Sequence, residues 1–589
     1  MAAAVDRTTP HVEPAMPVPA ATEPTVAPQL SHDLAGRRPA ETARFALIAV
    51  GAIAIVYGVL LRLWLLAHLP LFGDEAIVGL MARSIDSGHF SSFYWGQQYG
   101  GLEPYLAAIV LPLGGGGTPA LNATPALLSA LAAVLVGVIT FKVGRNRLLA
   151  FAAACLAWVW PFAVVWGSVR ELGVHWAALC CGLAAVACCV RAYRGLAGRM
   201  TFVVLGLLLG LGWWASPEIL YFAPPCLVLL GAWWWNASHA EFVEVQSDRA
   251  RPTRGTSLGL AVAGFFLGSL PWWYTNAHSG FASLRPGVLP ASNGASYGAR
   301  LSVFFHDMLP LQLGVRTVLS GSWVGGPIVG QTIFAVVLVL IGTAVGRAVW
   351  LCARRPRELT PVALGAGVVA FPFLYAAAPS TGFWIDGRYG VYLPALIAAL
   401  FGSVLAAPRR ETFSEAHGPS ARTASPGVLV SAALGVLGAT CLTAGAARAA
   451  GVPASPSFFS GWHSPDSPIQ QVVDGMRAHH IEYAYGDYWT AYDLDFVGHG
   501  QPVVSPSAFD VNRSAAIAAQ VRSSKDPAWL FFAPGQAAAA AAFSNPQPGP
   551  GPYTEASFEA LLRRRGVPFE VVKLGVLDAV VPAHRLTTP

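Results

Sequence analysis

A short stretch, residues 71–107, follows the first long apolar segment of the chain and is rich in acids. The candidates for chemistry among them are Asp74, Glu75 and Glu103, in a chain of which only 12% of the residues are charged. Carboxylates at the end of a membrane span commonly serve chemistry or the binding of an ion or substrate. Asp74 can act as a general base that takes a proton from an acceptor hydroxyl or amine. The alternative is that Asp74 caps, and Glu75 begins, an amphipathic helix over 75–87.

A second group of polar side chains lies in the segment WGSVRELGVHW, which contains Arg170, Glu171 and His175. These residue types can contact a substrate, but a local Arg–Glu surface pair would contribute little to stability. His175 can equally be an ordinary helix residue. For Glu103, the alternative is an acid at a helix terminus, where the helix dipole favours it.

Arg388, in the segment DGRYGVYLP, comes directly before an apolar run. Its planar guanidinium matches phosphate oxygens, so it suits a phosphate at headgroup depth. The alternatives are pairing with Asp386 and snorkelling toward lipid phosphates. Carboxylates alone could hold Mg²⁺ or Mn²⁺, but no ligand set has a clear metal spacing, so we assign no metal-ligating residue.

The composition indicates a membrane protein, so membrane-spanning elements must position these side chains. The chain has 589 residues, of which 54% are hydrophobic, and its mean hydropathy is +0.52. Soluble proteins carry about 25% charged residues, about twice the fraction found here. The net charge of +6 arises from bases between apolar runs, so it indicates contact with membrane lipids and not with nucleic acid. The cysteines suggest neither a disulfide framework nor a zinc site.

The apolar runs predict a polytopic α-helical membrane protein with about eleven transmembrane helices. The runs are 45–68, 123–141, 148–166, 173–190, 200–215, 218–235, 257–275, 329–351, 359–378, 389–407 and 427–447. Basic residues precede the first run. They then follow the second, fourth, sixth, eighth and tenth runs. By the positive-inside rule the N-terminus is cytoplasmic, and the region after the last run is extracytoplasmic. Residues 1–40, rich in Ala, Pro and Thr, are expected to be a disordered cytoplasmic tail.

The predicted topology gathers most conspicuous acids on the outer face. The largest early segment there is 69–122, the first outer loop, in which 104–113 is too short to span and is expected to lie along the membrane surface. Residues 41–450 thus form the transmembrane domain. The Ala, Gly, Arg and Pro content is typical of a high-GC bacterium, which places the protein in the bacterial inner membrane.

Residues 451–589 are expected to form a small extracytoplasmic α/β domain. Helices are predicted over 468–479, around TAYDLDFV, over 513–523 and over 555–565. Strands are predicted in IEYAYGD, QPVVS, AWLFFA, FEVVKLG and VLDAVVP, and a further helix over 537–542. Asp487, Asp493 and Asp495 could line a site, but we interpret them as exposed surface acids.

The order of these features resembles the GT-C glycosyltransferases. The resemblance rests on an apolar span, Gly73-Asp74-Glu75, an amphipathic helix ending in Ser-Gly, and an aromatic segment with Tyr99 and Glu103-Pro104-Tyr105. It continues at WGSVRELG and at GRYGVYLPAL. The similarity is greatest to the family 39 and protein O-mannosyltransferase-like branch, which includes lipid A aminoarabinose transferases.

The resemblance implies an inverting transfer of a sugar from a polyprenyl-phosphate-linked donor to a lipid, polysaccharide or protein acceptor, on the outer face of the membrane. It implies that Asp74 is the catalytic base and that Arg388 stabilises the leaving phosphate. Substrate-binding roles fall to the remaining matched residues, which are Glu75, Tyr99, Glu103, Glu171 and His175. The family commonly has Lys or His before Pro-Pro where this chain has GGLEPYL, so the second phosphate contact is open, and Arg170 is a candidate.

Two other hypotheses remain at this stage. A transferase of the same fold could move a different group between lipid carriers. A transporter or flippase of lipid-linked sugars would instead be expected to show internal repeats and acids near the bilayer midplane. The sequence has no convincing repeat, and its acids fall at the ends of spans.

Overall fold

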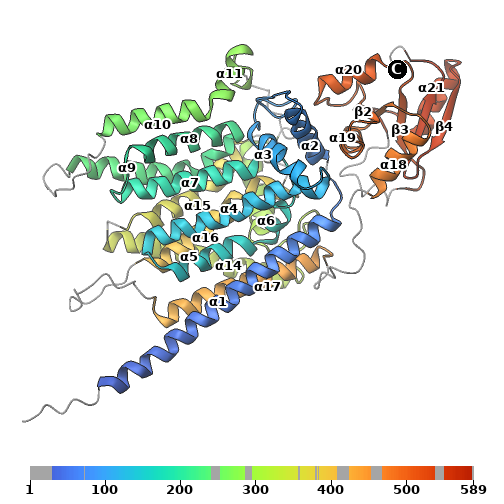
Figure 1. Ribbon diagram of the computed structural model, residues 1–589. Helices are drawn as coiled ribbons and strands as arrows, with labels where there is room; N and C mark the ends of the chain where they lie inside the picture. The colour runs from blue at the N-terminus through green and yellow to red at the C-terminus, as the bar shows by residue number, and fades with distance from the viewer. Residues whose placement is uncertain are drawn as a thin grey trace, which may run out of the picture.

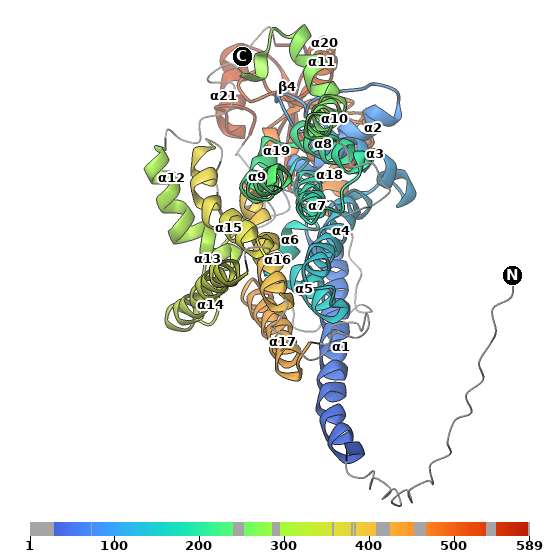
Figure 2. The ribbon, with the colours of Figure 1, turned by 90° about the vertical axis from the view of Figure 1, so that its left-hand side faces the viewer.

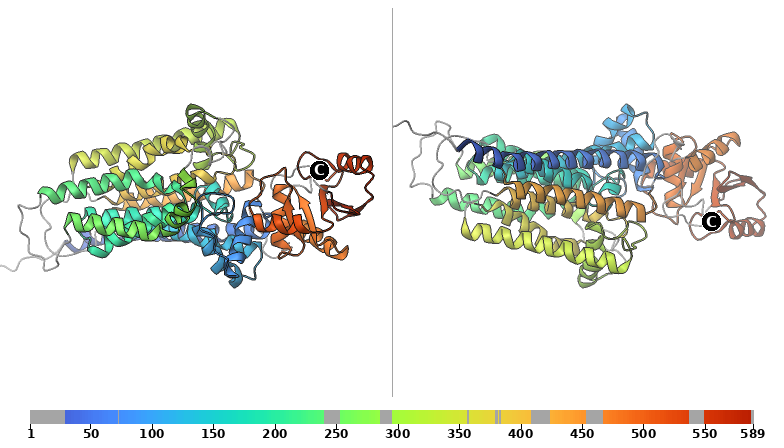
Figure 3. Two further views of the ribbon diagram at one scale, coloured as in Figure 1. Left: turned by 90° about the horizontal axis from the view of Figure 1, so that it is seen from above. Right: turned by 90° about the horizontal axis from the view of Figure 1, so that it is seen from below.

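The computed structural model describes residues 29–71, 73–239, 253–284, 295–355, 358–378, 381, 384–407, 424–452, 467–536 and 549–586. A bundle of long, roughly aligned helices forms the larger part, and a small α/β domain lies at one end of it (Figure 1). The first outer loop lies between the two parts, as both views of Figure 3 show in blue. Chain segments far apart in sequence therefore meet at this end of the bundle.

The bundle contains a helix at each predicted apolar run. Its elements are α1 (Gln29–His68), α4 (Thr118–Gly144), α5 (Arg147–Val159), α6 (Phe162–Gly167), α7 (His175–Tyr193), α8 (Arg199–Ala215), η1 (Pro217–Phe222), α9 (Ala223–His239), α10 (Arg254–Gly268), α11 (Leu270–His278), η3 (Ala282–Leu284), α12 (Tyr297–Val303), η4 (Phe304–Met308), α13 (Leu309–Gln312), α14 (Pro327–Arg354), α15 (Thr360–Ala377), η6 (Arg388–Gly390), α16 (Tyr392–Ala406) and α17 (Pro426–Ala449). Figure 2 shows α1 and α17 extending beyond the others.

A multi-pass membrane protein is confirmed, but the number of spans is not. Within the described ranges, eight helical segments are long and apolar enough to cross a membrane, or nine if α10 and α11, bent by 62°, form one span. The predicted spans at α5 and α8 are helices of 13 and 17 residues. A span needs about 17–25 residues, so the predicted count of eleven stays a prediction.

The N-terminal helix begins earlier than expected. Helix α1 starts at Gln29, so residues 29–40 are helical and the prediction of disorder is wrong for them. Extending an existing helix costs far less than nucleating one, and this segment is rich in Leu, Ala and Arg, which are good helix formers. Residues 1–28 lie outside the described residues.

Helices α8 and α10 pack through glycines on both partners. A Cβ atom on Gly206 would lie 1.9 Å from the carbonyl oxygen of Ala261, and one on Gly264 would lie 2.4 Å from that of Val203. Gly210 and Gly268 make the same kind of approach one turn further along. The two helices therefore meet through paired G-x-x-x-G motifs, a common solution for close helix packing in membranes.

The first outer loop contains the two predicted helices, α2 (Gly73–Asp86) and α3 (Leu102–Leu113). Both pack on other parts of the chain, because one face of each is buried. Buried residues of α2 include Glu75, Ile77 and Met81, and those of α3 include Glu103. The loop is therefore a packed layer at the end of the bundle.

The C-terminal region folds into the predicted α/β domain. Its elements are α18 (Ser467–Ala478), β1 (Tyr483–Gly486), α19 (Tyr488–Val497), β2 (Val503–Pro506), α20 (Ala515–Ser523), β3 (Ala528–Phe532), α21 (Glu555–Arg564), β4 (Phe569–Lys573) and β5 (Leu577–Pro582). The sheet order is β2-β1-β3-β5-β4. Strand β1 is parallel to β2 and β3, whereas β5 is antiparallel to β3 and β4. The helix predicted over 537–542 lies outside the described residues.

Three aspartates of this domain are buried, so their interpretation as surface acids is wrong. Asp487, Asp493 and Asp495 are 2%, 0% and 1% exposed. Asp487 caps α19 by accepting hydrogen bonds from the N–H groups of Trp489 and Thr490. Asp495 accepts one of 2.7 Å from the N–H of Val504 at the start of β2. Buried backbone donors at the ends of helices and strands need such acceptors.

The C-terminal domain shares a hydrophobic core with the first outer loop. One continuous buried cluster contains Ile77 and Met81 of α2 together with Leu494 and Phe496 of α19. The domain therefore packs on the membrane part through an apolar interface.

Candidate active site

A cavity of about 350 Å³ opens where the first outer loop meets the bundle. Its walls come from the start of α2, residues 94–99, the start of α7, η1, the end of α15 and η6. Its polar lining comprises Asp74, Gln97, His175, Ser216, Glu218 and Arg388, and four tyrosines, Tyr94, Tyr99, Tyr221 and Tyr389, add aromatic surface. Such a mixture of aromatic and polar groups is typical of a site for a small polar ligand.

One side of the cavity carries an ion pair between Asp74 and Arg388. Asp74 lies in the first turn of α2, and its Oδ2 lies 2.9 Å from Nη1 of Arg388. Arg388 Nε also pairs with Asp386, which in addition accepts a hydrogen bond of 3.1 Å from the Arg388 N–H. The side chains of Asp74 and Arg388 are 17% and 12% exposed, so they remain accessible from the cavity.

The turn before Arg388 is fixed by a glycine and a glutamine. Gly387 has a φ of 74°, a conformation that L side chains rarely adopt. Its carbonyl accepts a hydrogen bond of 2.7 Å from Nε2 of the buried Gln312. A Cβ on Gly387 would lie only 2.9 Å from that nitrogen. The sequence Asp-Gly-Arg therefore turns the guanidinium toward Asp74.

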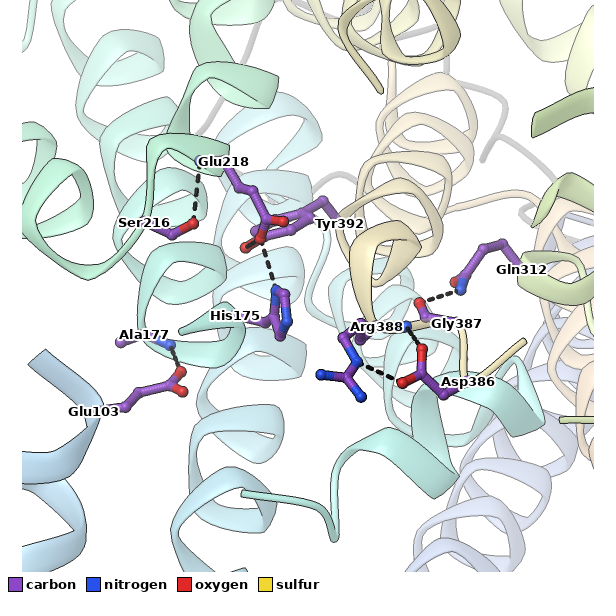
Figure 4. A network of polar contacts seen from close by, with 10 residues as sticks. All are labelled: Glu103, His175, Ala177, Ser216, Glu218, Gln312, Asp386, Gly387, Arg388 and Tyr392. Carbon is purple, nitrogen blue, oxygen red and sulfur yellow. Dashed lines mark hydrogen bonds and ion pairs between the residues drawn. The ribbon is translucent and has the colours of Figure 1, made fainter. Parts of the chain in front are cut away.

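The opposite side of the cavity carries a histidine–carboxylate pair. His175 Nδ1 lies 2.7 Å from Glu218 Oε2, and the same oxygen accepts a hydrogen bond of 2.5 Å from the Tyr392 hydroxyl. Figure 4 shows the His175 ring and the Arg388 guanidinium projecting toward the same space from different helices. A carboxylate on one ring nitrogen orients the other nitrogen of the imidazole.

Four of the predicted site residues lie behind the cavity wall. Glu75 is fully buried, with Oε1 at 3.1 Å from Nη1 of Arg170 and Oε2 accepting a hydrogen bond of 3.2 Å from Asn122. Asn122 in turn accepts a hydrogen bond of 2.9 Å from the N–H of Glu171. The alternative of a local surface pair between Arg170 and Glu171 is therefore wrong, because the two side chains are buried and Arg170 pairs with Glu75.

Glu103 and Glu171 form a buried acid pair. Glu103 accepts a hydrogen bond of 2.6 Å from the N–H of Ala177 at the start of α7, and Glu171 accepts one of 3.1 Å from Gly173. Burial raises the pKa of Glu103, and burial together with the charge of Glu103 raises the pKa of Glu171 further. Two neighbouring buried carboxyls disfavour simultaneous ionisation, so each one favours the protonated form of the other.

The structure thus divides the predicted site residues. Asp74, Tyr99, His175 and Arg388 line the cavity, whereas Glu75, Glu103, Arg170 and Glu171 do not. Among the described residues, no three His, Cys, Asp or Glu side chains cluster as metal ligands would.

The sequence-based prediction missed the role of Glu218 in the cavity wall. The sequence feature that could have indicated Glu218 is the one that indicated Asp74: an acid at the outer end of a span, here directly after Ser216-Pro217. It also missed Tyr488 and Arg513 of the C-terminal domain, for which the sequence carries no local signal.

Comparisons with known proteins identify the fold. No protein-family model matches the chain, and no curated protein matches it. The crystal structure of ArnT from Cupriavidus metallidurans bound to undecaprenyl phosphate matches with a TM-score of 0.55 at 11% identity, over 92% of this chain and 98% of ArnT. Its apo structure matches with a TM-score of 0.54 at 13% identity, over 91% and 97%.

A weaker match is the oligosaccharyltransferase of Archaeoglobus fulgidus in its apo form. Its TM-score is 0.43 at 13% identity, over 77% of this chain and 64% of that protein. The similarity to ArnT extends over both the bundle and the C-terminal domain. The chain therefore has the fold of ArnT, a helical membrane bundle with a small C-terminal domain.

Proposed function

We propose that this protein is an inverting glycosyltransferase that uses a polyprenyl-phosphate-linked sugar. The observation that carries the proposal is the Asp74–Arg388 pair at the cavity wall, 2.9 Å apart. It places a carboxylate that can accept a proton beside a guanidinium that can neutralise a phosphate. The GT-C fold, which in ArnT accompanies a site for undecaprenyl phosphate, supports the same reaction.

The proposed reaction is a single displacement. Asp74 takes the proton from the acceptor hydroxyl or amine while that atom attacks the anomeric carbon, on the face opposite the phosphate. The bond between the anomeric carbon and the phosphate oxygen breaks, and the phosphate leaves with the electron pair. Arg388 neutralises the charge that develops on it. Because the donor is already activated, catalysis depends on positioning, proton removal and charge stabilisation.

We propose that the cavity holds the sugar. Tyr99 and His175 would contact the sugar, and Glu218 would orient the His175 ring through the 2.7 Å contact. The buried Glu75, Glu103 and Glu171 would act indirectly, by fixing the loop segments that carry Asp74 and His175. Arg170 as a second phosphate contact stays a prediction that its burial beside Glu75 does not favour.

The proposal includes a location. We propose that the protein lies in the bacterial inner membrane with its cavity and C-terminal domain on the outer face and its N-terminus in the cytoplasm. A lipid, polysaccharide or protein acceptor would reach the cavity from that side. Every residue that lines the cavity comes from a segment that the basic residues assign to the outer face or to the outer end of a span.

The expected use of Mg²⁺ or Mn²⁺ finds little support in the residues present. Asp74 and Asp386 share the single guanidinium of Arg388, and the pKa values of the buried Glu103 and Glu171 are raised, which favours their protonated forms. None of these groups offers the cluster of ionised oxygens that a divalent cation prefers. We therefore derive no step through a metal ion.

The test is transfer of radiolabelled sugar in membranes supplied with a panel of polyprenyl-phosphate sugars. Wild type should transfer from at least one donor, and Asp74→Asn at matched expression should lower the rate by about 10²–10⁴-fold, as expected for loss of a general base. The matched control is Asp474→Asn, on an exposed face of α18, which should retain full activity. Movement of labelled lipid across the membrane without any transfer would instead identify a flippase.

A further inference from the structure

The carboxylate of Asp74 is contacted from two separate parts of the chain. Arg388 of the membrane domain pairs with Oδ2, and the hydroxyl of Tyr488, the first residue of α19, donates a hydrogen bond of 3.3 Å to Oδ1. Tyr94 of the first outer loop donates one of 3.1 Å to the Asp74 backbone carbonyl. The C-terminal domain therefore reaches the cavity-lining carboxylate itself, 414 positions away in the sequence.

The direction of the Tyr488 hydrogen bond is fixed by Arg513. Arg513 Nε lies 3.0 Å from the Tyr488 hydroxyl, and its guanidinium carbon lies 5.7 Å from the centre of the tyrosine ring. A guanidinium can only donate, so the hydroxyl accepts from Arg513 and its own proton is directed to Asp74. Burial and the charge of Asp74 raise the pKa of Tyr488, which keeps this proton on the phenol.

Arg513 also changes the local charge. Without it, two carboxylates, Asp74 and Asp386, face a single guanidinium, that of Arg388. The guanidinium of Arg513, held by Tyr488 and by a 3.3 Å hydrogen bond to the Gly96 carbonyl, supplies a second positive charge nearby. A cluster with balanced charge accepts an incoming phosphate at lower cost than one with excess negative charge.

The interface that holds Tyr488 in place is closely packed. A Cβ atom on Gly73 would lie 2.5 Å from the Trp489 ring, and one on Gly79 would lie 2.3 Å from the Phe496 ring. Arg83 of α2 donates a hydrogen bond of 2.6 Å to the Phe496 carbonyl. Together with the shared hydrophobic core, these contacts fix α19 along α2, from the residue next to Asp74 as far as Arg83.

We infer that the C-terminal domain is part of the catalytic centre, where Tyr488, held by Arg513, is a positioning residue for Asp74. The inference rests on the proposed function, because it assigns Asp74 the role of base. It gives the domain a role besides any recognition of the acceptor. The Tyr488 hydroxyl fixes the orientation of the carboxylate, so the other lone pairs of Asp74 face the cavity.

The test compares Tyr488→Phe with Tyr483→Phe, a tyrosine on β1 of the same domain. Tyr488→Phe should lower kcat at least about tenfold and change the donor KM less than about twofold, because misplacing a catalytic group costs rate more than binding. Arg513→Lys should retain more activity than Arg513→Gln, and Arg522→Gln on α20 should match wild type. A Tyr488→Phe protein as active as Tyr483→Phe overturns the inference, and so does a raised KM with unchanged kcat.

Two further measurements separate this inference from the proposed function. In an Asp74→Asn background, Tyr488→Phe should cause no additional loss, since residues that act as a unit are not additive; an additional tenfold loss would assign Tyr488 another role. Hydrogen exchange of α2 amides needs no activity. They should exchange slowly in wild type and at least tenfold faster in Gly79→Leu, and equally fast exchange in both proteins would overturn the docked geometry even if no donor is transferred.

Discussion

Asp74 and Arg388 lie 314 positions apart in the chain, and their side chains meet at 2.9 Å. Arg388 also pairs with Asp386, so one planar guanidinium joins two carboxylates from different segments. A lysine ammonium carries the same charge but lacks the planar fork whose separate Nη1 and Nε atoms face the two carboxylates here. The pair therefore requires arginine for its geometry as well as for its charge.

We predict that Arg388→Lys lowers kcat of the sugar transfer by about 100-fold, the loss typical of removing one group that stabilises developing charge. Arg388→Gln should lose still more, because the charge is also absent. The measurement is the initial rate of transfer in membranes at matched expression. Full activity of the lysine variant would show that only the charge matters and not the fork geometry.

The Glu103–Glu171 pair gives a prediction about stability. If the two neighbouring carboxyls share a proton, Glu171→Gln should mimic the protonated form and leave thermal stability at pH 7 nearly unchanged. Glu171→Ala should destabilise by about 1–3 kcal/mol, since it leaves the buried Gly173 N–H without its side-chain acceptor. Thermal unfolding of the purified protein in detergent measures both, and equal losses in the two variants would contradict the shared proton.

The same pair sets a pH dependence. Its pKa values are raised in the folded protein, so the folded state binds more protons than the unfolded state above the usual range of Glu. Stability should therefore decrease as the pH rises through the raised values. Glu171→Gln should show a smaller loss of melting temperature than wild type as the pH rises above the usual range of Glu, and parallel curves would argue against the assignment.

Asp487, in the C-terminal domain, is a second carboxyl whose ionisation should make stability depend on pH. Burial raises its pKa from the usual 3.8 to about 6, although it accepts hydrogen bonds at the start of α19. Ionisation of Asp487 in the folded domain is therefore unfavourable and lowers the stability of the domain. This loss of stability is absent below about pH 4 and complete above about pH 6. Asp487→Asn keeps an N-cap acceptor and removes this cost.

The variant should consequently stabilise the domain by about 3 kcal/mol at pH 7.5 and have little effect at pH 4, from about two pKa units at about 1.4 kcal/mol each. Hydrogen exchange of the β1 and β2 amides in the full-length protein measures the local stability at both pH values. A destabilised variant at pH 7.5 would mean that the charge itself is needed at the cap.

The glycines between α8 and α10 predict a packing defect. Gly264→Leu would force a side chain against the Val203 carbonyl, where a Cβ already lies at 2.4 Å, so the helices must separate. We expect a fall in melting temperature of at least about 1.5 °C, corresponding to roughly 2 kcal/mol in a protein of this size. Gly259→Leu, on the same helix with open space around it, is the control and should melt like wild type.

Much of the fold could be predicted because its signals are local. Each apolar run coincides with a helix of the bundle, and among the described residues after 467 each predicted helix and strand is present. These features depend on the length and periodicity of short segments. The span number is less certain because α5 and α8 are short, and a count by composition does not distinguish a short span from a buried helix.

The site could be predicted only in part. Asp74 and Arg388 were found because each lies at the end of an apolar run, and the alternation of basic loops assigns both ends to one side. The burial of Glu75 and Glu171 could not be predicted, because it depends on how the loop segments turn against α4 and α7. Tyr488 is part of the site only through the docking of α19 on α2, which no local pattern encodes.

The docking of the C-terminal domain has a consequence for biosynthesis. Asp74 leaves the ribosome early, whereas Arg388, Tyr488 and Arg513 follow hundreds of residues later. If both domains build the centre, a chain that stops early, or whose tail has not yet crossed the membrane, carries the base without its partners. Such a chain could not consume the lipid-linked donor, so completion of the last domain would switch the enzyme on.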